Sequence, residues 1–386
     1  MLEKKRVEEL DIIKGVGMLM IAVYHLVYRA QDGIPDKIIR SLGWALIAVF
    51  FMLSGYFSNP DKGVLNNYKR RFLGLMFPAM MAELFLLGVG GIYCRFFHEY
   101  STRDILHDAA VTFLRPEITT KISTEWGEGN TLFLNLSPVW YIWALGWTLI
   151  LFYPIEKLVI GKSLKWLAMV LFLIGIQIPI YLYVDALPWS LKIVPVFTVF
   201  MLIGMKAREI NLVNRLKDVS LGMTALYTVV FFAVHFILFL FGGTESYYIS
   251  ILGTRGWLDV PLVVLQLLVA FPAFFGLARL ISQVRPLAKY LSWVGRYSLT
   301  FLLFHSFFGL IFSDLLNTYL KMGPNWYMEN LGLTVTPEVF WKSVAVFVLS
   351  VICTMPCAVF GDFLARKVFE RRLRWRELRQ RKREGK

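Results

Sequence analysis

Charged residues are scarce in this sequence, and so are cysteines. Only 18% of its 386 residues are charged, whereas a soluble domain carries about 25%. The three cysteines, Cys94, Cys353 and Cys357, lack the spacing of metal ligands, so no metal site is expected. The N-terminal residues also lack an apolar run followed by a small-residue cleavage site. We therefore expect the first apolar segment to stay in the protein as a helix.

Apolar residues make up 57% of the chain and gather in ten segments. Most are long enough to cross a hydrocarbon core about 30 Å thick. Lipid offers no partners for loose backbone groups, so the segments should be helices. They lie near residues 12–28, 42–57, 72–93, 139–155, 166–184, 189–205, 219–241, 258–281, 297–320 and 338–361. The sequence predicts an all-α polytopic membrane protein, with a domain of about ten transmembrane helices over residues 1–365.

Positive charge is placed unevenly between the two predicted sides of the membrane. The formal net charge is +14, with 41 Lys and Arg residues. If the N-terminus is cytoplasmic, most of these residues fall on cytoplasmic loops, as the positive-inside rule requires. An even number of spans then places both termini in the cytoplasm. The basic charge thus follows from membrane topology, and nucleic acid is not expected as a partner.

Residues 366–386 form a strongly basic tail with Phe369, Leu373 and Trp375 interleaved among the cations. This pattern is typical of a helix that lies on anionic headgroups at the cytoplasmic face. Membrane lipids are therefore expected partners of this cytoplasmic tail.

The first span carries Lys14 near one end and His25 near the other. On a helix they are roughly 16 Å apart along the axis and share one face. Lys14 would reach the cytoplasmic headgroups, and His25 would lie more than halfway across. An imidazole within a membrane helix is costly and tends to be functional. With a reference pKa of ~6.5 it suits a general base, and the alternative is a histidine bonded to a neighbouring helix.

His305 lies nine residues after Arg296 in the ninth span, roughly 13 Å along the helix and near mid-membrane. Composition does not rank it against His25, and a structural histidine is an equal alternative. His98, His107 and His235 are treated as background.

Lys69, Arg70 and Arg71 cluster at the cytoplasmic end of the third span, at the depth of Lys14. They are either ordinary topology anchors or an anion-binding entrance. Arg binds phosphate oxygens through two parallel hydrogen bonds, and Lys adds a point charge.

Two further segments carry candidate residues. Ser54 precedes Gly55, and such small residues let helices approach closely. Ser54 is also a potential nucleophile, but no base lies beside it in the sequence, so packing is favoured. Trp140 begins the fourth span at the outer interface, as part of an aromatic belt or as a platform for a sugar ring.

Four segments in order, LDIIKGVGMLMIAVYH, FFMLSGY, PVWYIWAL and GRYSLTFLLFH, together give the chain a family likeness. The chain resembles the acyltransferase-3 family of bacterial membrane O-acyltransferases. It departs from the family pattern at Lys14, where the family more often has Arg. The third span, KRRFLGLMFP, also lacks a further Arg before its Pro and has Gly74 and Leu75 there.

The resemblance implies transfer of an acyl group, acetyl or succinyl, from cytoplasmic acyl-CoA to a sugar hydroxyl of an envelope or exopolysaccharide glycan. It implies the bacterial inner membrane as location and no permanently bound cofactor. His25 and His305 would be catalytic. Lys14, Lys69, Arg70 and Arg71 would hold the donor, and Asp11, Ser54 and Trp140 would contact substrate.

A transporter or flippase of a glycan or lipid-linked sugar is the main alternative. Such a protein would also have about ten helices with few polar groups, but it would favour inverted repeats and helices broken at matching places. Pro179, Pro195, Pro272 and Pro356 interrupt spans, yet no matching halves are visible.

Overall fold

The computed structural model describes residues 7–26, 34–97, 101–103, 105–106, 110, 139–184, 187–241, 258–319 and 341–361. These residues are helical or in turns, with no strand among them, which confirms the all-α prediction. The long helices are α1 (Glu8–Leu26), α2 (Ile34–Tyr56), α4 (Phe77–Phe97), α7 (Val139–Val159), α8 (Ser163–Tyr183), α9 (Val194–Glu209), α11 (Leu221–Phe241), α13 (Asp259–Ser282), α15 (Ser298–Tyr319) and Trp341–Gly361. The short elements are η1 (Pro60–Lys62), α3 (Val64–Arg71), η2 (Phe72–Met76), η3 (Pro188–Ile193), α10 (Leu212–Lys217) and α14 (Arg285–Arg296).

Seven helices in the described ranges are long and apolar enough to cross a membrane. They are Val64–Tyr93, Trp140–Val159, Ser163–Tyr183, Ser190–Glu209, Leu221–Leu240, Asp259–Ser282 and Trp341–Gly361. Two shorter apolar helices, Ser41–Tyr56 and Ser298–Gly309, coincide with the second and ninth predicted spans, and α1 occupies the first. The protein is therefore a multi-pass membrane protein. The count of ten and the cytoplasmic termini stay predictions.

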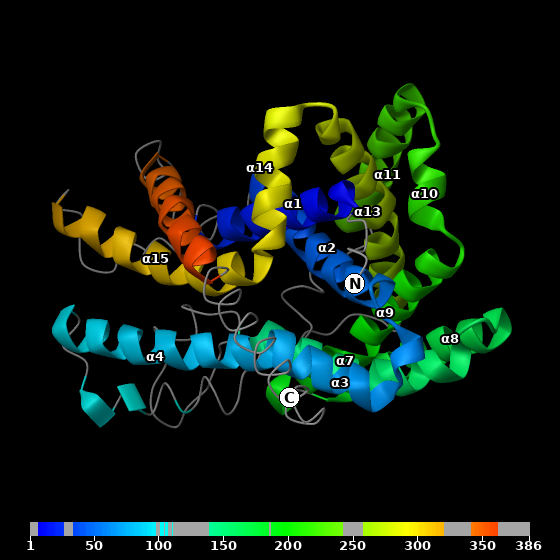
Figure 1. Ribbon diagram of the computed structural model, residues 1–386, viewed down its shortest axis with the longest axis horizontal. Coiled ribbons are helices and arrows are strands. Elements are labelled where there is room, and N and C mark those ends of the chain that lie inside the picture. The colour runs from blue at the N-terminus through cyan, green and yellow to red at the C-terminus, as the bar shows by residue number, and fades with distance from the viewer. Residues whose placement is uncertain are drawn as a thin grey trace, which may run out of the picture.

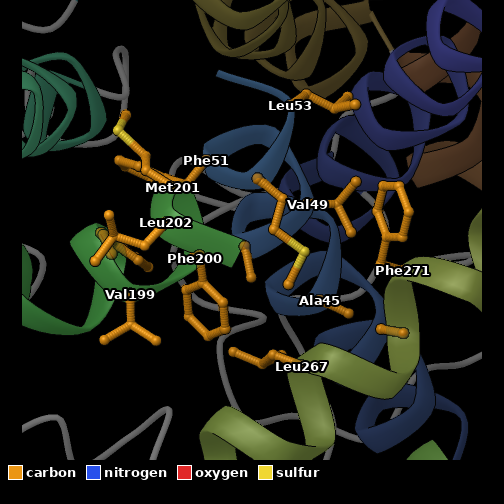
Figure 2. Packing of buried hydrophobic residues seen from close by; sticks show 14 of the residues in the cluster. Ala45, Val49, Phe51, Leu53, Val199, Phe200, Met201, Leu202, Leu267 and Phe271 are labelled. Carbon is orange, nitrogen blue, oxygen red and sulfur yellow. The ribbon is translucent and has the colours of Figure 1, made fainter. Parts of the chain in front are cut away.

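The centre of the bundle is built by α2, α9 and α13. Their buried side chains interdigitate in Figure 2, where Val49 of α2 lies among residues of α9 and α13. Phe51 stacks on Phe197 with ring centroids 4.1 Å apart, and Tyr141 of α7 meets Phe51 edge-on at 5.5 Å. Figure 1 shows the blue α1 crossing the yellow α14, while α11 and α13 run side by side at the right.

Glycines allow the closest helix contacts. A Cβ at Gly55 of α2 would overlap the Met201 carbonyl of α9, and one at Gly204 of α9 would overlap the Met52 carbonyl of α2. Gly15 of α1 faces α14 in the same way. Because lipid tails are as apolar as the side chains, helices in a membrane associate through close packing more than through hydrophobic burial. These glycines thus determine which helices can meet.

A tight turn joins α2 to the third span. Asn59 caps η1 by accepting a hydrogen bond from the Asp61 amide at 3.2 Å, and Gly63 takes a positive φ of 73°. The third span then starts as α3 and passes through the π-helical turn Phe72–Met76 before continuing as α4. Such a turn accommodates an extra residue and frequently lies at a functional site. Here it directly follows Arg71.

Several predicted features lie outside the described residues. They are the basic tail 366–386, His98, His107 and most of the predicted outer loop, which runs from about residue 94 to residue 138 between the third and fourth spans. The division of the chain into residues 1–365 and 366–386 therefore stays a prediction.

Candidate active site at the basic end of the bundle

Lys14 lies in the second turn of α1 and is held in place by a residue of the same helix. Its Nζ donates a hydrogen bond to Asp11 Oδ1 at 2.6 Å, and the same Nζ lies 5.9 Å from the centroid of the Phe57 ring. The Asp11 side chain is 8% exposed and that of Lys14 is 20% exposed. Asp11 thus orients the cation in this structure, and its predicted contact with substrate stays a prediction.

A buried polar cluster lies next to Phe57 and consists of Ser58, Glu156 and Arg208, hereafter the Arg208 cluster. Arg208 Nη1 donates to the Ser58 backbone carbonyl and, at 2.9 Å, to Ser58 Oγ. Arg208 Nη2 lies 3.4 Å from Glu156 Oε1, which also accepts a hydrogen bond from the Ser58 hydroxyl. Glu156 is 1% exposed. The cluster joins the ends of α2, α7 and α9.

Arg71 reaches the same part of α7 from α3. Its Nε donates to the Tyr153 hydroxyl at 3.3 Å. Tyr68, on the preceding turn of α3, donates to the Ile150 carbonyl, so two bonds fasten α3 to α7. Lys69 and Arg70 are exposed.

These contacts place three of the four predicted donor-binding cations, Lys14, Arg70 and Arg71, at or near one end of the bundle. Lys14 lies over Phe57, which adjoins Ser58 of the Arg208 cluster. Arg71 meets Tyr153, and Arg70 lies within electrostatic range of the same tyrosine. We call the group of Lys14, Arg70, Arg71 and the Arg208 cluster the basic mouth. The basic mouth lies at those helix ends that the loop charges predict to face the cytoplasm.

The two candidate histidines belong to helices that pack together. Met18 and Ile21 of α1 share a buried cluster with Phe301 and Leu302 of α15. His305 follows Phe301 by one turn and is 2% exposed. Its Nδ1 lies 2.7 Å from the Phe301 carbonyl oxygen, so Nδ1 carries the proton, and Ser306 Oγ lies 3.1 Å from Nε2.

His25 follows Ile21 by four residues, one turn further along α1. The side chain of His25 lies outside what the structure describes. The catalytic roles of His25 and His305 therefore stay predictions. The two residues belong to neighbouring helices, because α1 packs against α15.

Ser54 and Trp140 lie apart from the mouth contacts. The Ser54 hydroxyl donates to the Phe50 carbonyl of its own helix at 2.9 Å. Trp140 packs on Trp44 with centroids 6.1 Å apart. Trp140 lies in the first turn of α7 and Glu156 in its last turn, about 24 Å apart along the axis.

His235 has a structural environment. It is fully buried, with Nε2 2.6 Å from Ser41 Oγ and Nδ1 3.1 Å from the Gln266 carbonyl oxygen. It links α11 to α2 and α13, in line with its treatment as background.

Sequence reasoning missed Glu156, Arg208 and Glu83. Glu83 is 1% exposed in α4, on the face that packs against α7 and α15. A single acidic residue within the apolar run of the third span was a visible signal. In the sequence, Arg208 and Glu156 look like ordinary charges near loops, because nothing in the sequence indicates that they contact each other. Within the described ranges no group of three or more His, Cys, Asp or Glu side chains could hold a metal ion.

Comparison with known proteins defines the class. A family model described as an acyltransferase domain matches residues 7–361, nearly the whole chain. The all-helical, multi-pass fold agrees with a membrane acyltransferase. The chain belongs to the acyltransferase-3 family. Comparison with curated proteins and with solved structures finds no match.

Proposed function

We propose that this protein transfers an acyl group, acetyl or succinyl, from acyl-CoA to a sugar hydroxyl of an envelope or exopolysaccharide glycan. The observation that carries the proposal is the basic mouth, where cations of α1, α3 and α9 gather at one end of the bundle. Forked guanidinium groups and an ammonium group suit the phosphates of a nucleotide-bearing thioester. The donor would bind there from the cytoplasm.

The chemistry needs a base deeper in the bundle. Lys14 and His25 lie on one helix, roughly 16 Å apart along its axis, so an extended pantetheine arm could carry the thioester from the mouth towards His25. His25 takes the proton of the acceptor hydroxyl while its oxygen attacks the thioester carbonyl. The carbon–sulfur bond breaks, an ester forms, and the CoA thiolate leaves and is protonated to the thiol. An acyl-histidine intermediate is the variant of this scheme.

The acceptor would approach from the opposite end of the helices. Trp140 there offers an aromatic surface beside Trp44, and a sugar ring can stack on such a surface. His305, on the helix packed against α1, is the second candidate for handling the acceptor proton. The proposed location is the bacterial inner membrane, and the proposed partners are acyl-CoA, the glycan acceptor and membrane lipids. No permanently bound cofactor is required.

The test is thiol release from acyl-CoA by the purified protein with a glycan acceptor. Acetyl-CoA and succinyl-CoA are supplied separately, and mass spectrometry of the glycan identifies the group transferred. His25→Ala is expected to lower turnover by roughly 100-fold or more, the usual contribution of a general base.

His107→Ala, a histidine of the predicted outer loop, is the control and should keep wild-type turnover. Undiminished thiol release by His25→Ala at equal expression would remove His25 from the mechanism. Glycan flux into vesicles without acyl-CoA, unaffected by His25→Ala, would favour the transporter instead.

A further inference from the structure

The short helix α14 lies between two apolar helices. It begins at Arg285, three residues after α13 ends at Ser282, and it ends at Arg296, two residues before α15 begins at Ser298. Three residues of chain span at most about 10 Å. Because α13 is long and apolar enough to cross a membrane, α14 must lie near the membrane boundary. Loop charge predicts that this boundary is the cytoplasmic one.

One face of α14 packs against α1. Ala288, Leu291 and Gly295 on this face are buried. A Cβ at Gly15 of α1 would overlap the Leu291 carbonyl of α14. Figure 1 shows the two helices crossing. α14 is therefore part of the packed bundle, and its contact with α1 determines which of its side chains face away from the protein.

Three cations lie in a line along the exposed part of α14, hereafter the cationic stripe. Arg285, Lys289 and Arg296 are all exposed. Lys289 and Arg296 follow Arg285 by about one and three helical turns, so the three share one face over roughly 16 Å. The α14 sequence contains no acidic residue. Glu8 Oε2 of α1 lies 3.6 Å from Arg285 Nη1, but 75% of the Arg285 side chain is exposed, so the stripe stays open to a partner.

Apolar side chains flank the cationic stripe. Leu287 is 43% exposed and Tyr290 is 36% exposed. They are three residues apart and thus neighbours on the helix surface. Cations next to exposed Leu and Tyr side chains are typical of a helix that lies in the headgroup layer of a membrane. Tyr is enriched at that depth because its ring is apolar and its hydroxyl is polar.

We propose that the exposed face of α14 is a docking surface for anionic phospholipids. The cationic stripe contacts the headgroup phosphates, and Leu287 and Tyr290 contact the start of the acyl chains. Charge selects this occupant, because cations at the membrane surface attract anionic lipids. The basic tail 366–386 has the same sign of charge as the stripe and would be repelled by it. The proposal involves other cations than those of the basic mouth and does not depend on the proposed function.

Ordinary topology anchors would behave differently. If the three cations only face water, the charge of the lipid should matter no more at α14 than at any other basic loop. A docking surface instead predicts that anionic lipid binds the folded protein through α14. Because α14 is packed on α1, such binding should stabilise the bundle against unfolding.

The experiment measures thermal unfolding of the full-length protein in detergent, with phosphatidylglycerol or phosphatidylcholine added. Phosphatidylglycerol at about 100 times its Kd should raise the unfolding temperature of wild type by about 3 °C more than phosphatidylcholine does. The triple variant Arg285→Gln, Lys289→Gln, Arg296→Gln should lose at least half of this difference. High salt should reduce the difference in wild type, because it screens exposed charges.

The matched control removes three other exposed cations on the same predicted side, through Lys157→Gln, Lys162→Gln and Lys165→Gln together. It should keep the wild-type response. Equal responses of wild type to the two lipids would overturn the docking surface, as would an undiminished response of the α14 triple variant or an equal loss in the control.

Two further outcomes would assign the face to another occupant and overturn the lipid surface. One is stabilisation of wild type by inorganic phosphate as large as that by phosphatidylglycerol. The other is a dimer in size-exclusion chromatography that the α14 triple variant loses. If the triple variant does not fold, Leu287→Ser carries the test. It should also weaken the response to phosphatidylglycerol, and an unchanged response would overturn the proposal.

Discussion

At the scale of single residues, the five histidines illustrate how much a sequence can say. Their positions along the spans follow from counting, so His25 and His305 could be selected without coordinates. What a histidine bonds to depends on helices far away in the chain. His235 is bonded through both ring nitrogens, to residues 194 and 31 positions away. No local pattern could have shown that these partners meet.

Replacing His235 should therefore affect stability more than chemistry. His235→Ala leaves the buried Ser41 hydroxyl without its partner inside the membrane. The expected loss is roughly 1–2 kcal/mol of unfolding free energy, within the range for polar contacts in membranes. Thermal unfolding in detergent measures it.

The control for His235 is Val229→Ala on the same helix, because Val229 is 67% exposed to the surroundings. It should unfold at nearly the wild-type temperature. Unchanged stability in His235→Ala, or a loss of turnover in folded protein as large as that of His25→Ala, would contradict the structural role.

At the scale of elements, composition shows which helices contain glycines, and only the packing shows which of these glycines lie in close contacts. Glycine in a helix interior is expected to cost roughly 0.5–1 kcal/mol relative to Ala. The sequence alone cannot tell which glycines are needed. Gly204 touches the backbone of α2, whereas Gly175 of α8 has nothing within 4 Å of the position of a Cβ.

The two substitutions should consequently have opposite effects. Gly204→Ala places a methyl group against the Met52 carbonyl, so α2 and α9 must separate, and both the unfolding temperature and the yield of monodisperse protein should fall. Gly175→Ala should leave the unfolding temperature unchanged or raise it, because Ala is the better helix former. Size-exclusion chromatography and thermal unfolding compare them, and equal behaviour of the two variants would refute the close contact.

The third span shows a similar limit. Its apolar run predicts a helix, which the structure confirms, but not the π-helical turn at Phe72–Met76. That turn depends on backbone hydrogen bonds that shift by one residue, and side-chain periodicity does not record such a shift. α14 was likewise not predicted as a separate element. It packs closely on α1, because a Cβ at its Gly295 would overlap the Asp11 carbonyl.

At the scale of the whole molecule, loop charge predicts how the bundle lies in the membrane. The helix ends with Lys14, Arg71 and Arg208 were assigned to the cytoplasmic side from loop charge alone. The structure joins these ends through Phe57, Tyr153 and Glu156. That joining agrees with the predicted topology, in which all of these ends face the cytoplasm.

Reporter fusions test this orientation. Alkaline phosphatase fused after Asn130, in the predicted outer loop, should be active, and after Gly161, between α7 and α8, inactive. A fluorescent protein at the C-terminus should fluoresce, since the predicted tail is cytoplasmic. The reverse pattern at these sites would invert the orientation, and a mismatch at the C-terminus alone would refute ten spans.

The sequence by itself determined that the chain is a helical membrane protein, where most of its apolar helices lie, and which family it belongs to. These properties depend on local composition and on ordered short motifs, which are readable along the chain. Only the tertiary structure decided that Arg208, Glu156 and Ser58 form one cluster and that Arg71 reaches α7 beside it. The reason is physical. In lipid, helices pack through close backbone contact at a few glycines, and this packing brings together residues that are distant in the sequence.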